Sequence, residues 1–159
     1  MFLGKYSSTL DAKNRLSVPT PFKEKISEGV YITQGFDRNL LVLTIGAFEE
    51  VYRRVKSLNI ADPLARSLLR MILSTADKSG TNQDGFISIP EELKEFANLD
   101  KDVLVVGQGD YFEIWSVDLW QRQETQLRDV DSNAARFSTL TVATRYENLP
   151  QGITDLHHS

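Results

Sequence analysis

The chain has 159 residues, 41% of them hydrophobic, and contains no cysteine. Disulfides and thiol chemistry are therefore excluded, and no apolar run reaches the roughly 18 residues that a membrane-spanning helix needs. With 18 Lys and Arg against 22 Asp and Glu, the net charge of −4 weakens any expectation of a uniformly basic nucleic-acid-binding surface. We expect a globular cytoplasmic protein with no signal peptide and no membrane partner.

The first clear pattern is a short strand that ends at a proline. Arg15 to Val18 alternates polar and apolar residues, which predicts that Leu16 and Val18 are buried and that Arg15 and Ser17 face outward. Thr20 is predicted to cap a short helix with Pro21 in its first position, extending to Ser27. The apolar runs 30–35 and 40–43 are predicted to form the next two strands.

Two amphipathic helices are predicted to follow. The first covers Ala47 to Leu58, with Phe48 near its start. The second begins at the cap formed by Asp62 and Pro63. Its apolar residues recur at helical spacing: Leu64, Leu68, Met71, Ile72 and Thr75.

The sequence then repeats itself. Residues 11–19 return 71 positions later as residues 82–90, and the lag is 72 from Gly35 and Gly107 onward. The second copy predicts a strand at 86–89 with Ile87 and Ile89 buried, a helix at 91–97, strands at 103–107 and 112–115, and a helix opened by Trp120. Two tandem ββαββα-like units give an α+β fold.

The expected domain boundaries follow from this repeat. They are 1–58 for the first unit, 59–75 for a connecting helix, 76–128 for the second unit, and 129–159 for a polar tail. The tail has few large apolar residues beyond Phe137, Leu140, Val142 and Tyr146, so we expect little more than one weak helix there. A unit of about 60 residues is marginally stable alone, so the halves are expected to share one core or to build it with other subunits.

The sequence contains no motif typical of a catalytic site. The only histidines are His157 and His158, and no spacing typical of metal ligands occurs, so no metal, cofactor or catalytic residue is expected. Gly107-Gln108-Gly109 is compatible with a phosphate loop, which leaves a nucleotide-binding enzyme as one alternative. However, Phe112 stands where a dinucleotide-binding motif needs its third glycine, so a hairpin turn is the preferred interpretation.

Charge differs between the two copies. Residues 1–25 carry five Lys or Arg against two Asp or Glu, whereas residues 72–96 carry two against five. In the first copy Lys13 and Arg15 face outward, and Asp11 can hold the guanidinium of Arg15 in one orientation. A guanidinium fixed in this way suits the O6/N7 edge of guanine, and Lys13 suits phosphate. The alternative is an ordinary solvated hairpin with a surface ion pair.

Three segments together resemble the MraZ family of bacterial regulators over roughly residues 1–125. They are Met1-Phe2-Leu3-Gly4-Lys5-Tyr6, the run from Leu10 to Pro19, and the run from Gly109 to Trp115 with Trp120. The resemblance implies two AbrB-like halves that form a pseudo-two-fold, swapped-hairpin β-barrel. It also implies an octameric or similar ring, association with the nucleoid, and control of the promoter of the division and cell-wall gene cluster.

The family carries an Asp-x-x-x-Arg signature linked to DNA contact in each half. Asp11 and Arg15 match it in the first copy, so DNA contact is expected from Arg15, Lys13, Asp11, Asn14 and Lys5. In the second copy Asn82 and Phe86 replace the signature residues. We therefore expect the first half to read double-stranded DNA and the second to serve as scaffold and interface. An outward Phe86 suits a protein contact and is expected to add little to DNA affinity.

A ring would make one small basic turn per subunit sufficient. Several turns engaging direct repeats in a promoter gain on the order of 10² to 10⁴ in avidity. The resemblance suggests repeats that contain guanine, which suits Arg15. The second alternative, from a different class, is a ring-forming structural protein whose hairpins bind a protein partner.

Overall fold

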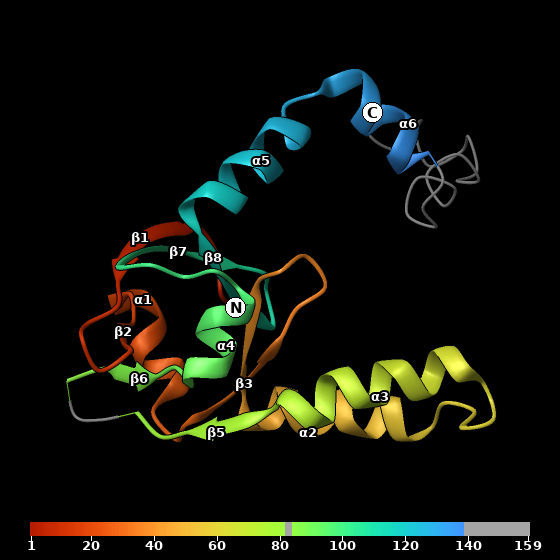
Figure 1. The fold of residues 1–159 in the computed structure, drawn as a ribbon, viewed down its shortest axis with the longest axis horizontal. Helices are drawn as coiled ribbons and strands as arrows, with labels where there is room; N and C mark the ends of the chain where they lie inside the picture. Colours follow the sequence, from red (N-terminus) through yellow and green to blue (C-terminus); the bar gives the residue numbers. More distant parts are fainter. Residues whose placement is uncertain (82–83, 139–159) are drawn as a thin grey trace, which may run out of the picture. The chain divides into compact units, whose positions relative to one another are not determined.

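The computed structural model describes residues 1–81 and 84–138, and the chain forms two compact units, Met1–Trp120 and Gln121–Ser159 (Figure 1). The order of elements is ββαββα in each half, as the sequence predicts. The elements are β1 (Lys5–Thr9), β2 (Arg15–Ser17), α1 (Thr20–Lys23), the 3₁₀ helix η1 (Glu24–Ile26), β3 (Val30–Gln34), β4 (Leu40–Thr44), α2 (Ile45–Lys56), α3 (Pro63–Thr75), β5 (Asp77–Ser79), β6 (Phe86–Ser88), α4 (Glu91–Phe96), β7 (Asp102–Gly107), β8 (Tyr111–Ser116), α5 (Val117–Leu127) and α6 (Val130–Phe137).

The strands of the two halves interleave. One sheet has the order β1-β7-β8-β4-β3-β5, and β2 pairs with β6 in a separate two-stranded ribbon. All of these pairs are antiparallel. The first strand of each half thus pairs with the third strand of the other, β1 with β7 and β5 with β3. The described pairings form an open sheet with edges at β1 and β5, and they do not close into the barrel that the resemblance implies.

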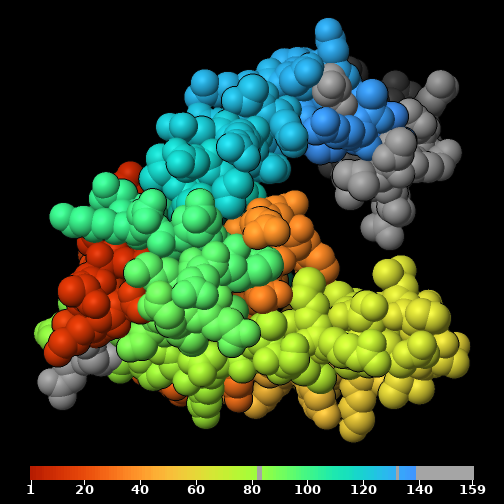
Figure 2. Space-filling view, viewed as in Figure 1, coloured from red at the N-terminus to blue at the C-terminus, as the bar shows by residue number. Residues whose placement is uncertain are grey.

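A single hydrophobic core joins both halves, which confirms one of the two expected ways of stabilising them. Phe2 and Phe22 come from the first half and Phe112 from the second, and their ring centroids lie 5.0 to 5.3 Å apart. At the central strand pair, Val42 lies opposite Phe112, and both side chains are fully buried. In Figure 2 the N-terminal segments in red and the second half in green share one face of the molecule. Neither half therefore has a core of its own.

The predicted buried positions of both short strands are confirmed. Leu16 and Ile87 are 0% exposed, and Val18 and Ile89 are also buried. Apolar side chains in alternate positions of β2 and β6 point into the core, so Arg15 and Phe86 are left on the opposite face of the ribbon. This alternation places Arg15 and Phe86 on the same face of the β2–β6 ribbon.

Three helix starts differ from the sequence prediction. Pro19 precedes α1 and Thr20 already lies inside it, with no side-chain cap. The helices α2 and α5 each begin three residues before the predicted aromatic openers, Phe48 and Trp120. At those starts the hydroxyl of Thr44 accepts from the Ala47 amide at 3.1 Å, and the hydroxyl of Ser116 accepts from the Leu119 amide at 3.1 Å. Small hydroxyl caps therefore define these ends.

The predicted helical pair between the copies is α2 and α3, which lie side by side (Figure 1). Asp62 caps α3 as predicted, because its carboxylate accepts from the Leu64 amide at 2.9 Å. Ile72 is buried, but the side chain of Leu64 is 77% exposed. In the tail, α6 is the one helix among the described residues, and Leu140, Val142 and Tyr146 lie outside them.

The Gly107-Gln108-Gly109 segment is a hairpin turn, as preferred from the sequence. The strands β7 and β8 pair directly across it, and the Gln108 amide donates to the Tyr111 carbonyl at 2.9 Å. The backbone of Phe2 lies so close to Gly107 that a Cβ there would come within 2.5 Å of the Phe2 carbonyl oxygen. This glycine admits the N-terminal segment into the sheet, which explains it without a phosphate.

Candidate nucleic-acid interface

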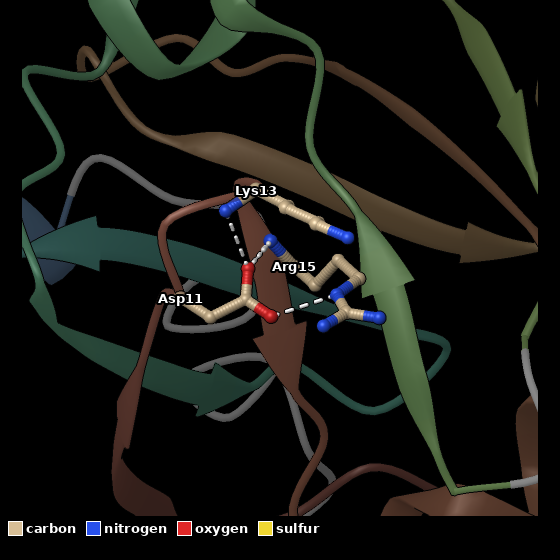
Figure 3. A network of polar contacts seen from close by, with 3 residues as sticks. All are labelled: Asp11, Lys13 and Arg15. Atoms are coloured by element: carbon tan, nitrogen blue, oxygen red, sulfur yellow. Dashed lines mark hydrogen bonds and ion pairs between the residues drawn. The ribbon is translucent and has the colours of Figure 1, made fainter.

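The turn between β1 and β2 is built around the carboxylate of Asp11 (Figure 3). Its Oδ1 accepts from the backbone amides of Lys13 and Arg15, both at 2.9 Å, and its Oδ2 accepts from Nε of Arg15 at 2.7 Å. The Asn14 amide also donates to the Asp11 carbonyl at 3.0 Å, which closes a tight turn. A short carboxylate that bonds to the amides after it is the standard means of fixing such a turn. Asp11 therefore shapes the turn and orients Arg15 at once.

These hydrogen bonds lower the pKa of Asp11. The backbone amide of Arg15 contributes most, and the Arg15 side chain and the Lys13 amide act in the same direction against desolvation. Hydrogen bonds to the charged form favour ionisation. The carboxylate is therefore ionised at neutral pH, as its pairing with a guanidinium requires.

Asn14 connects this turn to the second half. It adopts a left-handed conformation with φ of 58°, which asparagine tolerates better than most residues. Its carbonyl accepts from the Ile89 amide at 2.8 Å. Its side chain donates to Glu91 at 2.5 Å and accepts from the ammonium group of Lys94 at 2.9 Å. The polar groups of Asn14 are thus used to hold the turn against α4.

The pseudo-symmetric position of Asn14 is Gly85. That glycine has φ of 77°, and its carbonyl accepts from the Val18 amide at 3.1 Å. Each half therefore supplies one residue of positive φ whose carbonyl bonds to the strand end of the other half. The two turns share a backbone design but differ in side chain, because only Asn14 can also reach α4.

The guanidinium of Arg15 is held on two sides. Nε bonds to Asp11, and the guanidinium carbon lies 5.7 Å from the ring centroid of Phe86. Within the described residues, its two terminal nitrogens make no hydrogen bond or ion pair, and the side chain is 42% exposed. An Arg held by its Nε edge keeps its terminal nitrogens available for a bidentate acceptor.

Lys13 and Lys5 occupy different places. Lys13 is exposed at the tip of the turn, and its ammonium group has no partner in the described part of the chain. Lys5 lies at the far end of β1, about 13 Å along the strand from Thr9, and its ammonium group is 5.8 Å from the ring centroid of Trp120. The structure therefore brings together four of the five predicted residues, Asp11, Lys13, Asn14 and Arg15, and leaves Lys5 apart.

Sequence reasoning did not connect three residues of the second half with this turn. Phe86 is half-buried beneath Arg15, and Glu91 and Lys94 hold Asn14. Asn82 lies outside the described residues. The internal repeat contained a usable signal, since antiparallel pairing of the equivalent strands 15–17 and 86–88 places positions 15 and 86 diagonally on one face.

Residues 1–81 and 84–138 contain no group of three acidic or histidine side chains placed to hold a metal ion, and no helix there has the length and apolarity to cross a membrane. Glu113 is a partly buried carboxylate whose pKa is raised by desolvation, but it accepts hydrogen bonds from Trp115 and Asn39 at 3.0 and 2.8 Å. It is a satisfied structural group in the sheet.

Comparison with known proteins agrees with the repeat. A family model described as "MraZ protein, putative antitoxin-like" matches twice, over residues 1–71 and 72–142. A protein of Roseiflexus castenholzii named transcriptional regulator MraZ is 41% identical over 146 residues, covering 92% of this chain and 100% of that protein. A protein of the same name from Roseiflexus sp. is 38% identical, covering 92% of this chain and 100% of that protein. Another from Mycolicibacterium smegmatis is 34% identical, covering 88% of this chain and 97% of that protein. The expected resemblance is confirmed, and this is not an enzyme family.

Proposed function

The chain belongs to the MraZ family, and we propose that it is a sequence-specific DNA-binding regulator of transcription. Its first half reads DNA through the turn of Asp11, Lys13, Asn14 and Arg15. It acts in the cytoplasm at the nucleoid, as a ring that engages tandem repeats in the promoter of the division and cell-wall gene cluster. The relatives' names support the regulatory role, and the turn geometry supports the mode of contact.

The observation that carries this proposal is the orientation of Arg15. The Nε edge of the guanidinium is bound to Asp11, and its terminal nitrogens remain available on a partly exposed side chain. Two parallel N–H groups match the O6 and N7 acceptors that guanine presents in the major groove. Lys13 at the tip, with its ammonium group exposed, suits an adjacent phosphate. The turn thus offers one base-reading group and one positioning group.

A single such turn would bind weakly, so the proposal includes a ring. One subunit offers about three cations to DNA, which is too few for tight binding at physiological salt. Several turns on one assembly that meet repeated sites raise the effective concentration of each later contact. Lys5 lies on β1, away from the turn, and is proposed to contact the DNA phosphate backbone beyond the bases read by Arg15.

The test is a salt-titrated binding measurement. Fluorescence anisotropy would compare a duplex from the promoter of the organism's own division and cell-wall cluster with a shuffled duplex of equal length. We expect tighter binding to the promoter and a steep fall of log K with log salt, beyond the roughly three charges of one subunit. A slope near zero on both duplexes would instead favour a ring whose acidic second half binds a protein partner.

A further inference from the structure

Arg15 and Phe86 form a pair across the seam between the two halves. They lie on neighbouring antiparallel strands in which Arg15 is opposite Ser88 and Ser17 is opposite Phe86. The two residues are therefore diagonal neighbours on the outward face of the ribbon, within reach for a long side chain and a ring. The small serines at the other two corners leave space for the guanidinium to approach the ring at 5.7 Å.

We infer that Phe86 is a positioning residue for DNA recognition, which rests on the proposed function of Arg15. Asp11 fixes the Nε edge of the guanidinium, but a single edge contact leaves rotation about that bond. An aromatic ring within about 6 Å attracts a cation toward its face and adds a second constraint. Together the two contacts limit both the place and the tilt of the fork, which must be coplanar with a base to bond two acceptors.

This inference changes what the second half contributes. From the sequence, Phe86 was expected to suit a protein contact, because it is an outward apolar side chain in an acidic surround. In the structure, Phe86 stands beside Arg15 at the position where the family signature has a second arginine. A second arginine there would repel Arg15, whereas the aromatic ring attracts its guanidinium. The two halves therefore cooperate in one reading group in each subunit: the first provides Arg15 and the second supports it through Phe86, Glu91 and Lys94.

Conservative variants of Phe86 test this role. Phe86→Leu keeps an apolar side chain but removes the aromatic face, and Phe86→Tyr keeps the face. We expect Phe86→Leu to weaken promoter binding about two- to five-fold for each engaged subunit, in line with an exposed cation–π contact, and Phe86→Tyr to bind like the unmodified protein. Phe36→Leu is the matched control, because Phe36 is 67% exposed in the loop between β3 and β4 and its replacement should leave affinity unchanged.

A double-mutant cycle assigns the effect to Arg15. If Phe86 acts through Arg15, then Arg15→Ala with Phe86→Leu should bind no more weakly than Arg15→Ala alone. The NMR shift of the Arg15 Nε–H proton, measured without DNA, should lose the ring-current contribution in Phe86→Leu and keep it in Phe86→Tyr. Particle mass and thermal midpoint of each variant show whether folding or assembly has changed.

The outcomes separate the two claims. Loss of affinity on Arg15→Ala with none on Phe86→Leu would overturn the role of Phe86 and leave the proposed function standing. An equal further loss from Phe86→Leu in the Arg15→Ala background would also overturn it, because Phe86 would then act independently. If the unmodified protein shows no salt-dependent DNA binding, the proposed function fails and the positioning role fails with it.

Discussion

The two halves of this chain share a fold and differ in the turn that each presents. Equivalent core positions are buried in both, as the pairs Leu16 and Ile87 or Phe22 and Leu93 show. The exposed turn positions have diverged, because Asp11 and Arg15 correspond to Asn82 and Phe86. Packing constrains a buried position to be apolar and of suitable volume, whereas an exposed position is limited only by what it contacts. The divergence therefore marks where the halves have taken different roles.

The difference in charge points the same way. The basic window of the first half contains Lys13 and Arg15, and the acidic window of the second contains Glu91, which bonds to Asn14. The acidic residues of the second half are thus partly used in holding the basic turn of the first. An acidic net charge is compatible with a local DNA contact when the cations are concentrated in one turn of each subunit.

The largest expected effect comes from removing the reading group of the first half. Arg15→Ala should weaken promoter binding by about 1 to 3 kcal/mol per engaged contact, multiplied across a ring. The fold should persist, since Arg15 lies on the outward face of the ribbon. Anisotropy with promoter and shuffled duplexes measures this. Arg15→Lys is the matched control: it keeps the charge and the salt slope but should lose the preference for the promoter. Equal retention of that preference would contradict base reading by the guanidinium fork.

The next largest effect concerns assembly, because a single basic turn binds DNA weakly unless several copies act together. The exposed apolar residues of the α2–α3 pair and the family resemblance lead us to expect a particle well above a dimer. Light scattering at micromolar concentration checks this. Finding nothing larger than the 18.0 kDa monomer would contradict this prediction. A single turn per particle would then have to account for any DNA affinity.

Several features could be predicted from the sequence, because they depend on local patterns. Alternation in residues 15–18 and 86–89 revealed the buried faces, and the 71-residue repeat revealed the element order. The pairing of β1 with β7 could not be read in this way, since periodicity shows which face is buried but not which strand is adjacent. The contact between Arg15 and Phe86 depends on the register of β2 with β6, which alternation within either strand does not reveal. The hydrogen bonds of Asn14 depend on the position of α4. Helix starts were misplaced because Thr44 and Ser116 were not recognised as caps.

A smaller effect would come from making the first turn resemble the second. Asn14→Gly reproduces the residue at position 85 and keeps the positive φ, so it should cost only the bonds to Glu91 and Lys94. Asn14→Ala loses the same bonds and adds left-handed strain of about 1 to 2 kcal/mol. In urea unfolding, the free energy of unfolding should therefore be highest for the unmodified protein, lower for Asn14→Gly and lowest for Asn14→Ala. Equal stability of the two variants would mean that the strain is relieved by a change in the turn.

The smallest expected effect concerns the ionisation of Asp11, for which the second half has no counterpart because position 82 is asparagine. Its pKa should lie below the usual value of about 3.9. A carboxyl group with a lowered pKa stabilises the folded turn above its unfolded pKa, and that contribution is lost as pH falls through the folded pKa. NMR titration of the Asp11 carboxyl carbon checks this. In Arg15→Ala the pKa should rise only part of the way, because the largest contribution is the backbone amide at position 15, which alanine retains. A full return to the usual value would contradict this, and would show that the turn loses its backbone hydrogen bonds once Arg15 is removed.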